Sequence, residues 1–155
     1  MSVELVTSFY QAFSRRDAEG MVACYADDVR FSDPVFTDLH GERAKDMWRM
    51  LCERGKDLEI TFSDVKVDGD RGSAHWEAHY TFGATGKRVH NVIDASFVFA
   101  DGKIAEHVDS FDLRRWSGMA LGVTGKLFGW APFLQNAIRK NGAKALDAWS
   151  AKRAR

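Results

Sequence analysis

The hydrophobic pattern of this chain changes its period once, near Leu58, and that change limits the folds that the chain can adopt. Before this point apolar residues recur every three or four positions, which is the spacing of amphipathic helices. After it, apolar and polar residues alternate, as in strands with one dry face. Helical segments followed by a run of strands predict an α+β domain, with helices gathered on one face of a curved antiparallel sheet.

The first part of the chain is expected to hold three helices and one short strand. Residues 3–15 form the first helix, and Asp17 is the expected N-cap of a second, shorter one. The run VRFSD, which ends at Asp33, is a strand. Residues 41–55 form the third helix, because their apolar residues share one stripe and Gly55 stands at the C-terminal end.

The second part is predicted to form four strands, at residues 58–67, 73–83, 88–100 and 103–113. The first of them changes parity near Ser63–Asp64, which indicates a bulge. The segment 88–100 is apolar on both parities, as is typical of a central strand that is covered on both sides. Asp101–Gly102 predicts a hairpin turn into the last strand.

Length and charge divide the chain into a domain at residues 1–115 and an extension at residues 116–155. The total of 155 residues suits one domain. The domain carries 15 Lys and Arg against 21 Asp and Glu, whereas the extension carries 7 against 1. The extension begins with a glycine-rich apolar stretch that is too short to span a bilayer.

The rest of the extension is predicted to be a basic amphipathic helix. Its apolar side consists of Phe133, Ala137, Ile138, Ala145, Leu146 and Trp149. We expect this helix to pack on its own domain or on a dimer mate. A second interpretation is contact with an anionic membrane surface.

The composition indicates an intracellular protein with no nucleic-acid partner. The N-terminus has charges within its apolar pattern and no cleavage site of small residues, so it is not a signal peptide and we expect a cytoplasmic location. Cys24 and Cys52 fit neither a disulfide framework nor a zinc site and are expected to be free and buried. The body is acidic and its aromatic residues follow the core pattern, which argues against nucleic-acid binding.

Two aspartates are candidate catalytic residues. Asp33 ends the short strand directly before Pro34; it is either an ordinary turn residue or an acid that faces a cavity. Asp94 lies among apolar residues of the strand that we expect to be covered, where burial would favour its neutral form. An ionised carboxylate that removes a proton and a neutral acid that donates to an oxyanion form a complete pair. Alternatively, Asp94 is satisfied by the backbone or by an arginine.

These motifs resemble a known family. The stretch YADDVRFSDPVF, followed by HG and a helix, and the stretch VIDASFVFADGKI are similar to the ketosteroid isomerase branch of the NTF2-like (SnoaL-like) superfamily, over about residues 3–115. The resemblance implies an α+β cone whose helices and sheet enclose a deep pocket. It also implies that Asp33 is a general base, that Asp94 is half of an oxyanion hole, and that no cofactor is needed.

The tyrosines of that family are only partly matched. The second oxyanion donor is a tyrosine on the first helix, and the matching position is Phe9, with Tyr10 next to it and turned by about 100° around the helix. Tyr25 matches a supporting tyrosine, whereas a tyrosine of the third helix is replaced by Trp48 or Arg49. A binding module without catalysis is therefore the alternative to an isomerase.

The last strand offers a second candidate cluster. The run HVDSF puts His107, Asp109 and Phe111 on one face. Polyketide cyclases and dehydratases of the superfamily use a His or Asp from such strands, so the resemblance implies that His107 and Asp109 are pocket residues. The other interpretation is an exposed or dimer-facing strand face.

A third cluster is the run HWEAH, with His75, Glu77 and His79 on one strand face. This spacing could bind a metal, but it is weakly specific and no fourth ligand is evident, so we expect a solvated sheet face and no metal.

Taken together, these features predict a homodimeric protein that binds a small apolar carbonyl compound. Isomerase, polyketide cyclase or dehydratase, epoxide hydrolase and non-catalytic binding functions all stay open.

Overall fold

The computed structural model describes residues 2–154. Its first half consists of α1 (Ser2–Ser14), α2 (Ala18–Val22), β1 (Tyr25–Ser32), β2 (Leu39–His40) and α3 (Glu42–Arg54). Four long strands follow, β3 (Glu59–Asp68), β4 (Arg71–Phe82), β5 (Lys87–Ala100) and β6 (Lys103–Ser110). The chain ends in α4 (Leu113–Leu121), α5 (Val123–Phe128) and α6 (Pro132–Arg153). The predicted α+β class is confirmed, and the extension contains three helices where one was expected.

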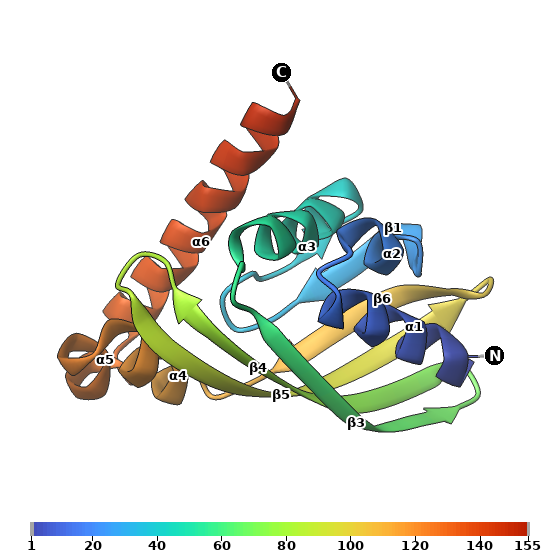
Figure 1. The fold of residues 1–155 in the computed structure, drawn as a ribbon, viewed down its shortest axis with the longest axis horizontal. Coiled ribbons are helices and arrows are strands. Elements are labelled where there is room, and N and C mark those ends of the chain that lie inside the picture. Colours follow the sequence, from blue (N-terminus) through green and yellow to red (C-terminus); the bar gives the residue numbers. More distant parts are fainter. Residues whose placement is uncertain (1, 155) are drawn as a thin grey trace.

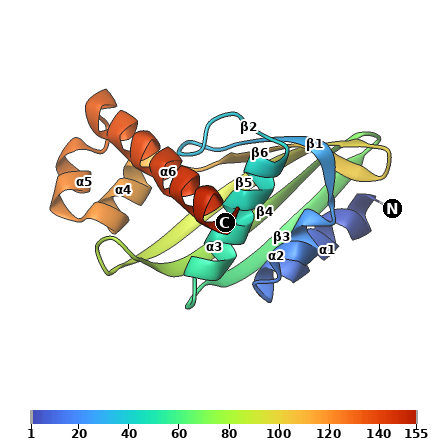
Figure 2. The ribbon, with the colours of Figure 1, turned by 90° about the horizontal axis from the view of Figure 1, so that it is seen from above.

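The strands form one curved, six-stranded sheet in the order β2-β1-β6-β5-β4-β3. Helices α1, α2 and α3 lie on one side of it (Figures 1 and 2). Neighbouring strands are antiparallel except β1 and β6, which pair in parallel, so the expectation of a wholly antiparallel sheet is wrong for this pair. A parallel pair needs a long connection, and the whole middle of the chain lies between these two strands.

Several local predictions are confirmed. The Asp17 side chain caps α2 by accepting a hydrogen bond from the Gly20 N–H at 3.0 Å. Strand β3 has its bulge at the predicted place, where Asp64 takes a positive φ of 54° and the register with β4 shifts. Asp101 and Gly102 both have positive φ, 52° and 74°, as a tight hairpin turn requires.

The two faces of the sheet differ sharply in exposure. Along β5, buried residues from Val89 to Phe99 alternate with half-buried or exposed ones. The expectation that this strand is covered on both sides is therefore wrong. Apolar residues such as Val92 and Val98 occupy the outer face, where they are half-buried. The inner face meets α1 and α3, and there the chain builds its main core.

Helix α6 runs alongside the domain, and its C-terminal part lies beside α3 (Figure 2). Leu146 is fully buried in the main core, and Ile138 belongs to a second apolar cluster with Leu113 and Trp116 of α4. Phe133, which was expected on the packed side of α6, is 65% exposed. None of the described helices is long and apolar enough to cross a membrane.

Candidate functional site

A chain of polar side chains runs through the interior of the cone. Tyr25 opens β1, while His107 and Asp109 lie two residues apart on β6 and so share its inner face. The Tyr25 hydroxyl lies 2.7 Å from His107 Nδ1, and His107 Nε2 lies 2.8 Å from Asp109 Oδ1. Trp48 Nε1 donates to the Tyr25 hydroxyl at 2.8 Å, and Trp76 Nε1 donates to Asp109 Oδ1 at 3.2 Å. We call these five residues the inner network.

The hydrogen bonds of the inner network fit one arrangement of protons. The Tyr25 oxygen accepts from Trp48, so its own proton is free to be donated to His107 Nδ1. His107 Nε2–H then donates to Asp109, which accepts a second bond from Trp76. In this arrangement the imidazole is neutral, Asp109 acts only as an acceptor, and every donor has a partner.

The inner network is shielded from water. His107 is fully buried and Asp109 is 3% exposed. The His107 ring stacks on Trp48, with centroids 5.9 Å apart, and lies 4.5 Å from the ring of Phe97 and 5.1 Å from that of Phe31. Hydrogen bonds in such a low-dielectric setting are electrostatically stronger than in water. Burial of His107 and Asp109 favours the prediction of interior residues over that of an exposed strand face.

Tyr10 brings an unpaired hydroxyl into the same interior. Phe9 and Tyr10 are both fully buried, because α1 packs with two sides against the rest of the domain. Phe9 lies against His107, with centroids 5.5 Å apart, and Tyr10 stacks on Phe62. The Tyr10 hydroxyl is a buried oxygen without a hydrogen-bond partner in the described chain. Burial raises the pKa of Tyr10 well above its usual value, and the charge of Asp109 adds to this shift.

Asp33 lies directly after β1, in a turn that fixes one of its oxygens. Its Oδ1 accepts the backbone N–H groups of Val35 and Phe36 at 2.7 and 2.6 Å. Within residues 2–154 no hydrogen bond engages Oδ2. Burial raises the pKa of Asp33 to about 7; the bond from Phe36 opposes this shift, and the charge of Asp109 adds to it. Asp33 and Asp109 thus interact through space, and Asp33 is half-protonated near neutral pH.

Asp94 lies on the other face of the sheet, which corrects the expectation that it is buried. Its side chain is 80% exposed and its Oδ1 lies 3.0 Å from His75 Nδ1. In the register of β5 and β6, Ala95 is the residue opposite Asp109, and Asp94 is opposite Ser110. Asp33 and Asp94 therefore do not meet in one cavity. The acid on the inner face is Asp109.

The cluster around Asp94 pairs histidines with carboxylates. His75 Nε2 and His90 Nε2 lie 2.8 and 2.7 Å from the two oxygens of Glu77, and the rings of His79 and His90 stack at 4.0 Å. The hydrogen bond with Asp94, followed by that with Glu77, raises the pKa of His75. In the part of the chain that the structure describes, no group of three or more potential ligands is arranged to hold a metal ion.

Helix α6 covers the turn that holds Asp33. Arg139 Nε donates to the Pro34 carbonyl at 2.9 Å. At Gly142 the backbone comes so close to this turn that a Cβ atom would lie 3.0 Å from Val35 Cγ1. Among the pockets of the described residues, one of about 760 Å³ lies beside α4 and α5, and one of about 160 Å³ lies at the sheet. No residue of the inner network lines either of these two pockets.

A comparison with protein-family models identifies the family of this chain. The model of the SnoaL-like domain matches residues 6–107, which span α1 to most of β6. The chain belongs to the SnoaL-like domain family. The predicted NTF2-like, SnoaL-like membership is thereby confirmed. A search of curated proteins finds no significant match.

Solved structures of this SnoaL-like fold are similar at low sequence identity. A protein described as a polyketide cyclase from Pseudomonas putida is 22% identical, with a TM-score of 0.65 over 77% of this chain and 98% of that one. An LEH-like epoxide hydrolase from M. tuberculosis is 21% identical, with a TM-score of 0.63 over 85% and 93%. A protein with a ketosteroid isomerase-like fold from Catenulispora acidiphila, in complex with trimethylamine, is 13% identical, with a TM-score of 0.66 over 76% and 92%. At these identities the likeness establishes the fold.

Proposed function

We propose that this SnoaL-like protein binds a small apolar compound with a carbonyl group and moves a proton next to that carbonyl. The observation that carries the proposal is the side chain of Asp33, whose pKa is raised to about 7 beside a buried network that is linked to it by the charge of Asp109. A general base works best when its pKa lies near the working pH, because it then both accepts and returns a proton readily.

The proposed step needs two protein groups, a base and a hydrogen-bond donor. Asp33 Oδ2, which has no partner in the described chain, takes the proton from the carbon next to the carbonyl. The electron pair of the broken C–H bond moves into the carbonyl, and the oxygen that gains charge accepts a hydrogen bond from the unpaired Tyr10 hydroxyl. Asp33 then returns the proton to the same carbon or to another one of the dienolate, so no oxidant, reductant or cofactor takes part.

His107 and Asp109 serve this step as positioning residues. Both ring nitrogens of His107 are engaged, by Tyr25 and Asp109, which leaves neither free for a substrate. Their role is to hold the fixed charge of Asp109 near Asp33 and Tyr10, where it raises the pKa of both. An isomerase that pairs Asp33 with Asp94 is not supported, since Asp94 lies on the other face.

The printed descriptions of the similar structures fit chemistry on small organic molecules. They include a polyketide cyclase, an epoxide hydrolase and a protein with a ketosteroid isomerase-like fold. The choice between isomerisation, cyclisation and dehydration depends on the substrate, which the fold does not specify.

A second candidate function is binding without turnover, which the packing of α6 over the Asp33 turn favours. A protein that only holds a ligand has no need for a base, and its affinity would not depend on the charge state of Asp33. Both candidates use the same interior, so the test must separate binding from proton transfer.

The test measures exchange of α-hydrogens for deuterium in a panel of enolisable and β,γ-unsaturated ketones, followed by NMR in D2O. Wild-type protein should exchange at least one ketone, and Asp33→Asn should slow the exchange by about 10²- to 10⁴-fold while ligand binding persists. Asp94→Asn is the matched control and should leave the rate unchanged. Exchange that survives in Asp33→Asn would refute the proposal, and binding of a ketone without any exchange would establish the second candidate.

A further inference from the structure

One end of the molecule carries a patch of exposed apolar side chains. We call it the apical patch; it consists of Val123, Leu127, Phe128, Trp130 and Phe133, which are 71, 60, 43, 61 and 65% exposed. These residues belong to α5, to the turn after it and to the first turn of α6. Figure 1 shows α5 at the extremity of the molecule, beyond the end of the sheet. Contiguous exposed apolar residues of this size mark an interaction surface.

The packing of α5 fixes the apical patch in its outward position. Gly125 is buried against α4, and a Cβ atom at this position would lie only 1.8 Å from the Ser117 carbonyl oxygen. Since α5 contacts α4 through the side that contains Gly125, Val123 and Leu127 must face away from the domain. Trp130 Nε1 donates to the Leu127 carbonyl at 3.0 Å, which ties the turn after α5 to this exposed side.

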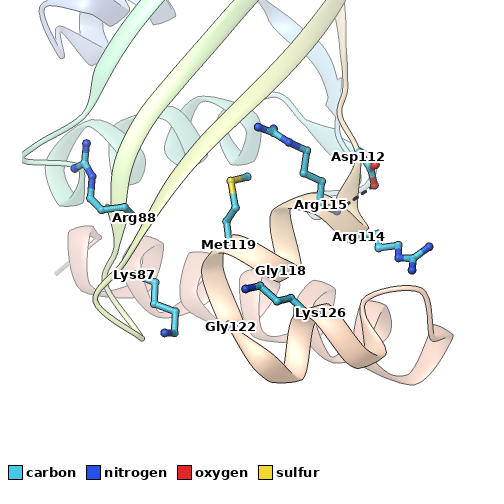
Figure 3. Close-up of a pocket in the computed structure, with 9 residues that line it drawn as sticks. All are labelled: Lys87, Arg88, Asp112, Arg114, Arg115, Gly118, Met119, Gly122 and Lys126. Carbon is cyan, nitrogen blue, oxygen red and sulfur yellow. Dashed lines mark hydrogen bonds between the residues drawn. The ribbon is translucent and has the colours of Figure 1, made fainter.

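A basic groove borders the apical patch. The pocket of about 760 Å³ is lined by Lys87 of β5, Arg114 of α4 and Lys126 of α5, among others (Figure 3). Within residues 2–154 none of these three cations forms an ion pair. The lining carboxylate is Asp112, which accepts from the Arg115 N–H at the start of α4. On α5, Lys126 is only about 60° around the helix axis from Val123, so charge and apolar surface adjoin.

We propose that the apical patch and the basic groove together bind the surface of an anionic phospholipid bilayer. Lys87, Arg114 and Lys126 would contact lipid phosphates, while Leu127 and Trp130 enter the boundary between headgroups and acyl chains. Interfacial helices bind anionic membranes in the same way: their apolar side chains are buried in the bilayer surface, and adjacent lysines and arginines attract the anionic lipids. Tryptophan favours this boundary because its ring is apolar and its N–H is polar.

The charges favour a lipid surface over a second copy of the chain. A symmetric contact through the apical patch would bring the Lys87, Arg114 and Lys126 side chains of both copies together, with Asp112 as the one carboxylate in each groove lining to oppose them. The other exposed large apolar residues, Val3 and Val108, stand alone on α1 and β6 and offer no matching apolar surface. The homodimer that the sequence predicts would therefore use another face.

The test is co-sedimentation of the whole protein with vesicles of phosphatidylcholine, with and without phosphatidylglycerol. The protein should bind only the anionic vesicles, and added salt should release it. Lys126→Gln combined with Arg114→Gln should lower the partition constant about 25-fold, since each cation near an anionic surface contributes about 5-fold. The matched control is Lys66→Gln with Arg71→Gln, which removes the same two charge types at the far end of the sheet and should have no effect.

Tryptophan fluorescence tests the apolar half of the proposal. Trp130 is 61% exposed, so vesicle binding should shift its emission to the blue, and lipids with brominated acyl chains should quench it. Trp130→Ala should remove that response and weaken binding, whereas Val3→Ala should not. Leu127→Ser replaces Trp130→Ala if thermal unfolding shows that the latter is not folded.

Three outcomes would overturn the inference: equal binding to neutral and anionic vesicles, equal loss in the Lys66 and Arg71 control, or a dimer by light scattering that Leu127→Asp dissociates. The last result would assign the apical patch to a second copy of the chain. Failure of vesicle binding would leave the proposed proton transfer at Asp33 untouched, because that site lies in the interior.

Discussion

The two faces of one sheet carry the same residue types in opposite settings. On the inner face His107 is bonded to Asp109, and the side chains are 0 and 2% exposed. On the outer face His75 is bonded to Asp94, and the side chains are 28 and 80% exposed. The positions are almost adjacent, since Asp109 faces Ala95 in the register and Asp94 is the next residue. A shift of one residue along β5 therefore leads from the buried His107–Asp109 pair to the solvated His75–Asp94 pair.

This contrast shows that the environment sets the role of a histidine–carboxylate pair. The inner pair cannot be hydrated, so each of its bonds must be kept for the fold to persist. The outer pair is in contact with water and salt, which replace any bond that is lost. The contrast can be tested by making equivalent changes on the two faces.

The largest difference is expected between Asp109→Ala and Asp94→Ala. Without Asp109, the N–H groups of His107 and Trp76 are left buried and unpaired, so the free energy of unfolding should fall by about 2–6 kcal/mol, at about 1–3 kcal/mol for each donor. Asp94→Ala should leave the urea midpoint unchanged. If both variants lose the same stability, the assignment of inner and outer faces is wrong.

The next effect concerns Asp33 and pH. Because the folded state holds the pKa of Asp33 at about 7, well above its unfolded value, the folded protein binds the extra proton. Stability should therefore be highest below about pH 4 for this group and fall as pH rises to about 7, by on the order of 2–4 kcal/mol. Asp33→Asn keeps an acceptor for Val35 and Phe36, and should remove this slope and be the more stable protein above pH 7. Urea unfolding across this pH range measures it, and identical slopes would contradict the pKa.

A smaller effect separates two buried tyrosines. Tyr25→Phe removes the acceptor of Trp48 and the donor to His107, so it should cost about 1–3 kcal/mol of unfolding free energy. Tyr10→Phe is the matched control; its hydroxyl has no partner in the described chain, so its loss should be neutral or stabilising. A costly Tyr10→Phe would mean that its hydroxyl is bonded in solution.

The smallest effect is expected for His75 on the outer face. Its pKa is raised by Asp94 and then by Glu77, so its contribution to stability is present below about pH 6 and is lost as pH rises through the raised pKa. His75→Gln should lower the free energy of unfolding by less than about 1 kcal/mol at pH 5 and not at all at pH 9. High salt should remove the difference, and a difference that resists salt would indicate a buried pair.

The sequence predicts the fold well because its signals are local. The change of period near Leu58, the cap at Asp17 and the turn at Asp101–Gly102 each depend on residues close together in the chain, and all three agree with the structure. The family resemblance adds the cone and draws attention to the Asp33 turn. What it could not supply is which residues meet across the sheet.

The misplacement of Asp94 has a physical cause. In β5 both parities are apolar, so the pattern does not reveal which face is inside, and Val92 and Ile93 made the acid look buried. Alternation is clear in β4, where Trp76 is buried as predicted, but its bond to Asp109 depends on strand register. The packing of α6 on the Asp33 turn likewise depends on Arg139 and Gly142. Arg139 and Pro34 are 105 residues apart in the chain, so no local pattern predicts their contact.

Helix α6 is one continuous helix that connects two distant parts of the molecule. It begins beside Phe133 in the apical patch, and at Gly142, about 14 Å further along its axis, it rests on the turn of Asp33. A displacement of its first turn is therefore passed to the cover of the interior. We expect docking at one end and entry of a ligand at the other to be thermodynamically linked, in which case each changes the affinity of the other by the same factor.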